Sequence, residues 1–312
     1  MRLRFILGNL VSLVRSLSPK EINKSICKTF DLIGFNIDKP VRQVAIKPNL
    51  CYYWDASTGY TTDPRIVSGV IDWVRDRLGV DTEIKIVESD ATGMRTKLAF
   101  LILGYEKLAR EKDVELVNLT DVPSIVEKVT VNKHEYDFKV PLLLKEADLF
   151  INVPKLKIMR ISRITCAMKN IFGCISSPRK IVYHPRISEA IVGINKILKP
   201  HVTLVDGIVG LGRYPIKLDL IMASKDVFSL DWVASEIMGY SPSEIDFLNL
   251  SRKEGLGESQ GIQTVGEDPK DIRKIFPKAG RLSTEYLWSL QIGLLKTYAK
   301  IVDDIIPPFV QE

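Results

Sequence analysis

The sequence predicts an α/β fold: a mostly parallel sheet with helices on both faces, plus a small hairpin and helical terminal extensions. From residue 43 onward, short apolar runs rich in Val and Ile alternate with longer amphipathic segments, which is the pattern of strands joined by helical crossovers. The chain has 312 residues, 46% of them hydrophobic and 26% charged, so it can bury a sizeable core. That length suits one large α/β domain or two smaller ones.

The expected strands are short, and most of them end in polar residues. Apolar, β-branched runs bounded by Gly, Pro, Asn or Asp are typical of strands in a buried sheet. Two further runs, at residues 126–131 and 136–144, flank a polar segment and predict the hairpin. The strands of the sheet are expected at residues 43–50, 83–89, 114–119, 148–156, 202–208 and 218–224.

Amphipathic segments fill the intervals between the strands. Ser18, Pro19 and Glu21 are typical of a helix N-terminus, so a helix is expected to begin there and to continue to about residue 33. Apolar residues at helical spacing predict further helices at residues 63–78, 95–112, 161–173, 186–198 and 229–239.

Changes in composition divide the chain into four segments. Residues 1–40 are interpreted as a helical N-terminal extension, and residues 41–257 as the α/β core domain. Residues 258–280 include a run rich in Gly, Gln, Glu and Asp, which is typical of a linker. Residues 281–312 predict an amphipathic C-terminal helix. Both terminal segments are apolar enough that we expect them to pack on the core, on each other or on a second subunit.

Composition narrows the class of protein. The formal net charge of +6 is compatible with an acidic ligand, nucleic acid or a membrane surface, and equally with lysines on solvated helix faces. The four cysteines form no CxxC pair, so they indicate neither a zinc ribbon nor an iron–sulfur cluster, and so few thiols suggest a cytoplasmic protein. Because no run of about 18 uncharged apolar residues occurs, no transmembrane span is expected.

Polar residues collect where the predicted strands end. Lys47 and Asn49 follow the first strand, Lys155 and Lys157 the fourth, and Asp206 the fifth. In an open α/β sheet, ligands bind outside the carboxyl ends of the strands. Each of these residues taken alone could be ordinary turn chemistry. Together they predict a binding site along one edge of the sheet.

Lysines are the strongest candidates for holding an anion at that edge. Lys155 and Lys157 lie two residues apart, so their side chains point the same way in an extended segment. Lys169 lies in an apolar stretch, where it must extend to solvent, pair with an acid or serve a ligand. On the helix expected there, Lys169 would share a face with Thr165, and Asn170 would follow it.

Lys47 is expected to be the most costly lysine to lose for ligand binding, because the strand before it should be central and rigid. Pro48 should end the strand pairing, and Asn49 would place a donor and an acceptor beside the charge. The alternative is an ion pair between Lys47 and either Glu88 or Asp90 on the next strand, in which case loss of Lys47 would leave a buried carboxylate without its partner.

Two further segments add polar groups. Thr61, Thr62 or Asp63 could cap a helix that begins at Pro64, where free amides favour an anion, although simple capping is the alternative. Lys180 and His184 lie in a polar loop. A lone histidine in such a loop is more often structural or solvated, but it could serve a ligand.

The acidic residues leave two chemical roles open. Glu88, Asp90 or Asp206 could act as a general base or bind a hard cation such as Mg²⁺, with Glu88 and Asp90 as the metal candidates. Converging lysines lower one another's pKa, which could make one of them a base or a nucleophile. The catalytic candidates are Lys47, Lys169 and Asp206, and the ligand-binding candidates are Asn49, Thr62, Asp63, Lys155, Lys157, Asn170, Lys180 and His184.

The motifs also resemble a known family. "KPNL", "TTDPRIV", "INVPKLK", "TCAMKNIFGC", "VDGIVGLG" and "ASKDVFSLDWVASEIMG" occur in the order seen in the domain-of-unknown-function family numbered 362, from about residue 43 to about residue 257. The resemblance implies an α/β domain and no settled reaction. Some relatives carry ferredoxin-like cysteine segments, which this chain lacks, so no iron–sulfur cluster is expected. The loop after "VDGI" is also shorter than is usual in relatives.

The leading hypothesis is a cytoplasmic α/β protein that binds, and acts enzymatically on, a small carboxylate or phosphate at the lysine-rich strand ends. One alternative is a nucleic-acid-binding protein in which Tyr52, Tyr53 and Trp54 stack on bases. Another is a subunit whose terminal amphipathic helices form a homo-oligomer, bind a protein partner or lie on a membrane. The cysteines Cys51, Cys166 and Cys174 are interpreted as core residues, with roles as nucleophiles or soft ligands left open.

Overall fold

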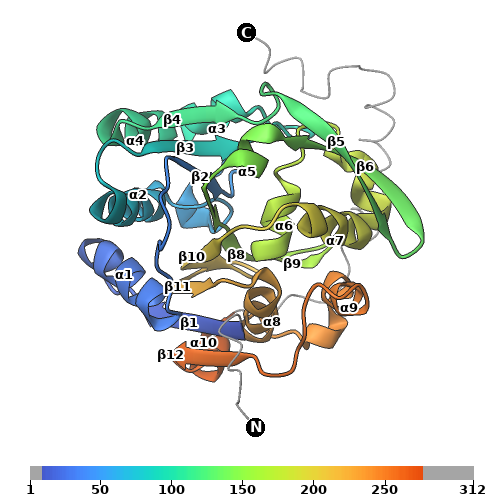
Figure 1. The fold of residues 1–312 in the computed structure, drawn as a ribbon. Helices are drawn as coiled ribbons and strands as arrows, with labels where there is room; N and C mark the ends of the chain where they lie inside the picture. Colours follow the sequence, from blue (N-terminus) through green and yellow to red (C-terminus); the bar gives the residue numbers. More distant parts are fainter. Residues whose placement is uncertain (1–8, 277–312) are drawn as a thin grey trace.

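A mostly parallel sheet organises the molecule, and in the computed structural model, which describes residues 9–276, it has ten strands (Figure 1). The strand order is β12-β1-β11-β10-β7-β2-β3-β4, with β8 pairing with both β10 and β9. The strands are β1 Leu10–Arg15, β2 Gln43–Pro48, β3 Glu83–Glu88, β4 Glu115–Asn118, β7 Leu149–Val153, β8 Lys155–Met159, β9 Arg163–Thr165, β10 Val202–Leu211, β11 Pro215–Ser224 and β12 Gln263–Gly266.

Helices cover both faces of this sheet, as the sequence predicts, and a separate hairpin pairs β5 Ser124–Val131 with β6 His134–Pro141 (Figure 1). The helices are α1 Ile22–Leu32, α2 Pro64–Leu78, α3 Thr96–Ile102, α4 Tyr105–Lys112, α5 Leu142–Glu146, α6 Ala167–Phe172, α7 Ile187–Ile197, α8 Val227–Ile237, α9 Asp246–Lys253 and α10 Pro269–Ile275. Short 3₁₀ helices are η2 Pro19–Glu21, η3 Ala56–Thr58, η4 Lys180–Arg186 and η5 Pro242–Glu244.

Alternation along β2 decides where its polar end points. Val44 and Ile46 belong to the hydrophobic core shared with α1 and α2, whereas Ala45 belongs to the core shared with α6, α7 and α8. Successive side chains of a strand point to opposite faces, so Lys47 lies on the same face as Ala45. The strand therefore directs its terminal lysine toward the face of the sheet that α6 covers.

The strand that ends in Lys47 is central, as expected. β2 pairs in parallel with β7 on one side and with β3 on the other, and its pairing with β7 ends at Pro48. Residues 44–48 of β2 are buried. A parallel strand covered on both faces reads as a continuous apolar run, which explains why "VAI" carries no alternating polar residues.

The expected helix across residues 1–40 is wrong for residues 10–15. These residues form β1, which lies between β11 and β12 and pairs with both. The physical reason is that residues 11–14 are buried, and three of these four residues are apolar, so the segment suits an inner strand better than a one-sided helix. The helix that follows Pro19 is present as η2 and α1.

Two other predicted segments differ from the structure. The helix expected at residues 161–173 is wrong over its first half, because Arg163–Thr165 pair with β8 as β9 and only Ala167–Phe172 are helical. The linker expected at residues 258–280 contains β12 and α10, the latter beginning at Pro269 and capped by Asp268.

The predicted C-terminal helix lies outside the described residues, as do residues 1–8. In the described part of the chain, none of the helices combines the length and hydropathy needed to cross a bilayer.

Strand β12 depends on a glycine at its end, and this dependence can be tested. Gly266 has a φ of +97°, and a Cβ at this position would lie 2.1 Å from the backbone oxygen of Leu13 on β1. Gly239 has a similar φ of +85° with nothing within 4 Å of a Cβ, so it provides a matched control. Replacement of either glycine by alanine adds backbone strain, but only Gly266→Ala also forces β12 away from β1.

We therefore expect Gly266→Ala to lower the free energy of unfolding by about 2 kcal/mol more than Gly239→Ala does. Urea unfolding of the two variants measures the difference. Equal losses would mean that β12 adds no stability to the sheet.

Candidate functional site

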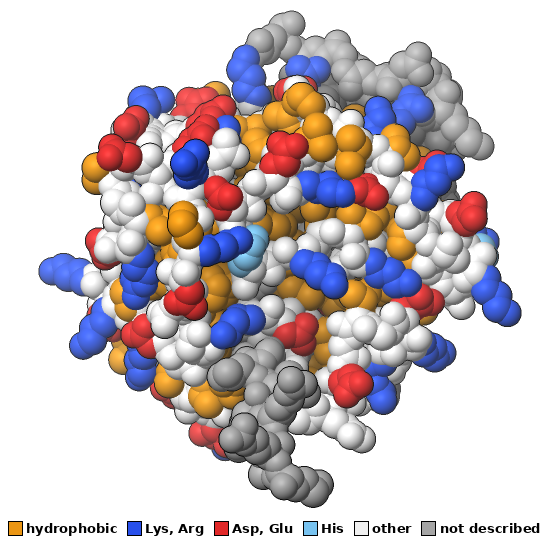
Figure 2. Space-filling model, viewed as in Figure 1, with side chains coloured by type: hydrophobic (Ala, Val, Ile, Leu, Met, Phe, Trp, Pro, Cys, Tyr) orange, Lys and Arg blue, Asp and Glu red, His pale blue; other side chains and the backbone are white. Residues whose placement is uncertain are grey.

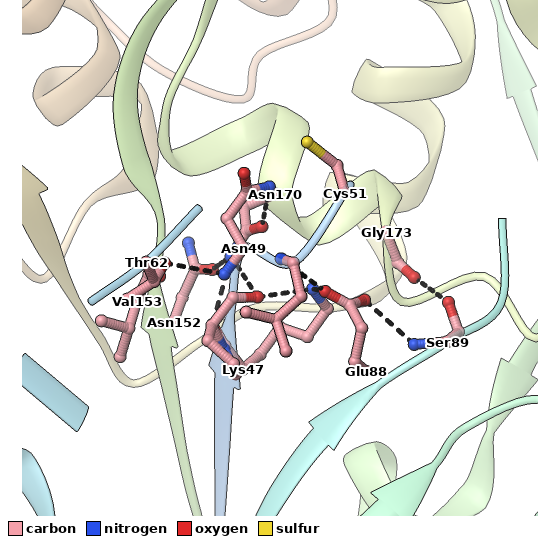
Figure 3. Close-up of polar contacts among 12 residues, drawn as sticks. Lys47, Asn49, Cys51, Thr62, Glu88, Ser89, Asn152, Val153, Asn170 and Gly173 are labelled. Carbon is pink, nitrogen blue, oxygen red and sulfur yellow. Dashed lines mark hydrogen bonds and ion pairs between the residues drawn. The ribbon is translucent and has the colours of Figure 1, made fainter. Parts of the chain in front are cut away.

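Three asparagines join the ends of β2 and β7 to helix α6, as the close-up shows (Figure 3). The Asn49 side chain donates to Asn170 Oδ1 at 2.9 Å, and Asn170 Nδ2 donates to Asn152 Oδ1 at 2.8 Å. Asn170 Nδ2 also lies 3.1 Å from the backbone oxygen of Lys47. All three side chains are buried, so these hydrogen bonds satisfy groups that water cannot reach. They fix the position of α6 over the strand ends.

Lys47 is paired with an acid. Its Nζ lies 2.7 Å from Glu88 Oε2, and its side chain is 1% exposed (Figure 3). The Glu88 carboxylate also accepts from the backbone N–H groups of Leu50, at 3.1 Å, and Ser89, at 2.9 Å. The ion pair that stood as the alternative to a ligand-binding Lys47 is therefore the arrangement present in the structure.

Lys155 and Asp206 form a second buried ion pair, 2.8 Å from Nζ to Oδ2. Asp206 also accepts from the backbone N–H groups of Asp63, at 2.8 Å, and Ile208, at 3.0 Å. With these acceptor sites occupied, Asp206 holds the start of α2 against the middle of β10. Its position is that of a structural anchor between two elements.

Thr62 and Asp63 stabilise the turn into α2. Thr62 Oγ1 accepts from the backbone N–H of Asn49 at 2.9 Å and donates to the backbone oxygen of Val153 at 2.8 Å. Asp63 accepts from the backbone N–H of Arg65 and pairs with the Arg65 guanidinium at 2.5 Å. Simple capping, one of the two interpretations given to this segment, is thus present at Asp63.

Lys157 has no carboxylate partner among residues 9–276. Its Nζ donates to Asn49 Oδ1, to Cys51 Sγ and to the backbone oxygen of Tyr60, each at 2.8 Å. The residue is 1% exposed. A buried ammonium is costly unless a negative charge lies nearby, so this position differs physically from those of Lys47 and Lys155.

Lys169 lies close to that unpaired charge. Its Nζ donates to Ser162 Oγ at 2.9 Å, and the residue is partly exposed. Burial and, to a smaller extent, the positive charge of Lys157 lower the pKa of Lys169 to about 8. Mutual lowering of lysine pKa values was expected from the sequence. Because residue 165 belongs to β9, Thr165 and Lys169 do not share a helix face.

A fifth lysine, Lys180, lies on the other side of the Lys47–Glu88 pair. Lys180 is buried and donates to Ser89 Oγ at 2.7 Å and to the backbone oxygen of Asp90. Burial lowers the pKa of Lys180 to about 8; the carboxylate of Glu88 opposes this shift and the charge of Lys47 adds to it. His184 lies one turn further along η4 and is half-buried, and its role in binding stays a prediction.

The two metal candidates have other partners. Glu88 is occupied as described above, and the Asp90 carboxylate accepts from the backbone N–H of Thr96 at 2.8 Å and from Asn118 at 3.3 Å. Over residues 9–276, the structure contains no group of three or more His, Cys, Asp or Glu side chains arranged to hold a metal ion. The Mg²⁺ site at Glu88 and Asp90 gains no support from this geometry.

Many of the predicted residues meet in a buried network of hydrogen bonds and ion pairs, and their role in ligand binding stays a prediction. Lys47, Lys155 and Lys157 are at most 1% exposed. A cavity of about 760 Å³ lies elsewhere, where the end of α9 and the loop after it provide Arg252, Lys253 and other residues. Around Lys157, the residues Cys51, Tyr60 and Lys169 are partly exposed.

A family model matches most of the α/β core of the chain. The family model described as "Domain of unknown function (DUF362)" matches residues 44–236, which is more than half of the chain. The chain belongs to the DUF362 family. A thylakoid-associated protein of Synechocystis sp. is 28% identical over 234 residues, which cover 71% of this chain and 70% of that protein.

A solved structure also resembles this DUF362 chain. It is the lactate racemase apoprotein from Thermoanaerobacterium thermosaccharolyticum, with a TM-score of 0.46 and 12% sequence identity. The match covers 76% of this chain, and the chain spans 58% of the length of that structure.

The structure adds site residues that sequence reasoning missed. Asp231 is buried in α8 and accepts from the backbone N–H groups of Ala167, at 2.6 Å, and Met168, at 3.0 Å, so it caps α6. The sequence offered a signal for Asp231, because a charged residue in the apolar run "SLDWVASEIMG" is as unusual as Lys169 is in its own apolar stretch. Tyr60 takes part through its backbone oxygen, for which a sequence gives no signal. Of the cysteines assigned to the core, Cys166 and Cys174 are buried, whereas Cys51 is only half-buried and contacts Lys157.

Replacement by methionine should change the free energy of unfolding differently at Lys47, which pairs with a carboxylate, and at Lys157, which does not. Lys47→Met would leave Glu88 buried without its cation, so we expect the free energy of unfolding to fall by about 3–5 kcal/mol. Lys157→Met leaves no carboxylate behind, and we expect a much smaller loss or a gain, because only hydrogen bonds to neutral acceptors disappear. Urea unfolding of both variants tests this. Similar losses in the two variants would show that the Lys47–Glu88 pair is not special.

The cap of α6 predicts a pH effect. Burial raises the pKa of Asp231 to about 7, although the backbone N–H groups of Met168 and Ala167 act to lower it. A carboxyl with a raised pKa binds its proton more tightly in the folded state, so its contribution to stability is complete below about pH 4 and is lost as pH rises to about 7. Asp231→Asn cannot ionise. We expect the stability deficit of this variant relative to the unmodified chain to shrink between about pH 5 and pH 8. A deficit that grows over this range would contradict the prediction.

Proposed function

We propose that this chain binds a small carboxylate or phosphate at Lys157 and Lys169, and that Lys169 transfers a proton to or from the bound molecule. The observation that carries the proposal is that two neighbouring ammonium groups lack a carboxylate partner within residues 9–276. We call these two residues the cationic pair. Lys47 and Lys155 each pair with a carboxylate. Lys180 has no carboxylate of its own either, but it lies on the other side of the Lys47–Glu88 pair and donates to Ser89 and to the backbone oxygen of Asp90, so the neighbouring Lys157 and Lys169 are the two that we assign to a ligand.

Electrostatics favours an anion at this position. Withdrawal of a charge from water is costly, and a ligand carboxylate or phosphate would supply the missing negative charge. The three N–H donors of Lys157 are used by acceptors of the protein, so its charge is fixed in position and would attract an anion electrostatically. Preorganised charges of this kind stabilise charge that develops in a reaction. The more exposed Lys169 would meet the ligand first.

The remaining predicted residues take supporting roles in this proposal. The Lys47–Glu88 and Lys155–Asp206 ion pairs fix neighbouring strands relative to one another, and Asn49 accepts from Lys157 through its Oδ1. Lys47 and Asp206, which the sequence suggested as catalytic, are positioning residues here. Asn49 is placed to hold the Lys157 ammonium in one orientation.

Proton transfer is the chemistry that suits Lys169. A general acid or base works best when its pKa lies near the operating pH. The pKa of Lys169 is lowered to about 8, first by loss of contact with water and then by the charge of Lys157. The side chain can therefore exist in both protonation states near neutral pH.

A nucleic-acid-binding role fits the described residues less well. Backbone phosphates are contacted by exposed basic side chains, whereas Lys47, Lys155 and Lys157 are buried. On the face shown in Figure 2, Lys and Arg side chains are interspersed with acidic and apolar ones and form no continuous stripe. The proposed role in assembly or on a membrane rests mainly on terminal segments that lie outside the described residues.

The proposal includes a cytoplasmic location, which the four free cysteines support. The competing location is a membrane surface, since the Synechocystis relative is thylakoid-associated.

Titration calorimetry with inorganic phosphate and with acetate tests the proposed function. Because the ammonium form of Lys169 attracts the anion, affinity should fall as pH rises through about 8, and binding near that pH should take up protons. Lys169→Gln should weaken binding about tenfold or more and abolish this pH dependence.

The control is Lys107→Met, which removes a lysine whose side chain is 76% exposed on α4. This variant should bind both anions as the unmodified chain does. Absence of binding by the unmodified chain, or equal binding by the Lys169→Gln variant, would refute the proposal.

A further inference from the structure

Three aromatic rings border the cationic pair. Tyr60 is at their centre: its ring centroid lies 6.0 Å from that of Tyr52 and 6.4 Å from that of Trp54. Lys157 Nζ lies 5.8 Å from the centroid of the Tyr60 ring and 2.8 Å from the backbone oxygen of the same residue. The rings thus lie next to the unpaired charge, and we call the three rings of Tyr52, Trp54 and Tyr60 the ring wall.

The ring wall faces solvent although it consists of large apolar groups. Trp54 is 59% exposed and Tyr52 is 38% exposed. Rings that serve only to close a loop are normally buried by it, whereas exposed aromatic side chains beside a charged site are typical of ligand-binding surfaces.

The segment that carries the rings is held in place by local hydrogen bonds. Thr61 Oγ1 donates to the backbone oxygen of Trp54 at 2.6 Å, and the Asp55 side chain accepts from the backbone N–H of Ser57. Gly59, at a φ of +75°, packs against Gly210 and Leu211 of β10. The two exposed rings therefore project from a backbone that is fixed against the sheet.

A buried hydroxyl points to the same place. Thr165 is the direct partner of Lys157 in the antiparallel pairing of β8 and β9, so the two side chains lie on the same face of the sheet. Thr165 is 3% exposed, and its Oγ1 has no hydrogen-bond partner among the described residues. A buried hydroxyl without a partner is costly, and an oxygen of a bound anion would satisfy it.

We propose that the anion bound at the cationic pair is carried by a flat aromatic ring, which stacks on Trp54 and Tyr52. This inference rests on the proposed function, because it adds a second half to the ligand that Lys157 and Lys169 bind. The ligand class is an aromatic or heteroaromatic carboxylate or phosphate ester. Its anionic group meets Lys157, Lys169 and Thr165, and its ring lies against the wall.

The test compares three probes that share one anionic group: inorganic phosphate, phenyl phosphate and cyclohexyl phosphate. Stacking on aromatic side chains should make phenyl phosphate bind about tenfold tighter than inorganic phosphate. Cyclohexyl phosphate is of similar size but cannot stack as a flat ring, so it should bind less tightly than phenyl phosphate. Titration calorimetry gives the ratio of affinities for each probe pair.

Two substitutions of Trp54 test whether the ring of the probe stacks on the ring wall. Trp54→Ala should bring the ratio of phenyl phosphate to inorganic phosphate affinity close to one, and Trp54→Phe, which keeps an aromatic ring, should preserve most of it. The Phe variant also reports whether loss of the ratio in Trp54→Ala arises from the missing ring or from a disturbed loop.

The outcomes separate this inference from the proposed function. Equal affinities for phosphate and phenyl phosphate in the unmodified chain would refute stacking on the ring wall but would leave the proposal of anion binding intact. A ratio that survives Trp54→Ala, or that is lost equally in Trp54→Phe, would overturn the assignment of stacking to Trp54. Binding of none of the three probes would refute the proposed function itself, and the inference with it.

Discussion

Burial of lysine charge at the ends of the central parallel strands is the constraint on which the rest of this structure depends. Lys47 and Lys155 are withdrawn from water and each meets one carboxylate, Glu88 and Asp206 respectively. Each carboxylate also accepts backbone N–H groups from a neighbouring element, which offsets part of the cost of burial. The ion pairs consequently determine where β2, β3, β8 and α2 can lie relative to one another.

The asparagine network extends this constraint to the helices. Asn170 joins α6 to both β2 and β7, and Asp231 of α8 caps the N-terminus of the same helix. Helix α6 has only six residues, so its own hydrogen bonds could not hold it in place. Its position is set from outside, by a carboxyl at one end and an amide network along one side, and that position brings Lys169 to the edge of the cluster.

Much of this arrangement follows from the sequence, for identifiable reasons. The β2 strand, its central place and its end at Pro48 were predictable because a buried parallel strand leaves a continuous apolar run and proline ends pairing. The gathering of Lys47, Lys155 and Asn170 near the strand ends was predictable from the rule that polar residues of an α/β site follow the strands.

What the sequence could not decide is which lysine pairs with which acid. Lys47 had Glu88 and Asp90 within reach on the next strand, and only the register of β2 against β3 selects Glu88. Residues 163–165 carry a helical pattern in sequence, yet pairing with β8 overrides it. Likewise, β1 is a strand because β11 and β12 lie on either side of it, and neither is near it in the chain.

The charge balance of the cluster explains why a closed network can still belong to a binding site. If every lysine had found a carboxylate, the cluster would be explained by stability alone, and replacement by apolar residues would be the simpler solution. Lys157 and Lys169 leave that balance incomplete on the side where Cys51, Tyr60 and Lys169 are partly exposed. On the other side of the Lys47–Glu88 pair, the buried Lys180 also lacks a carboxylate of its own, but it donates to Ser89 and to the backbone oxygen of Asp90. An incomplete balance beside partly exposed residues is the arrangement expected when a protein reserves part of its charge for a ligand, because the ligand completes the balance only when it is bound.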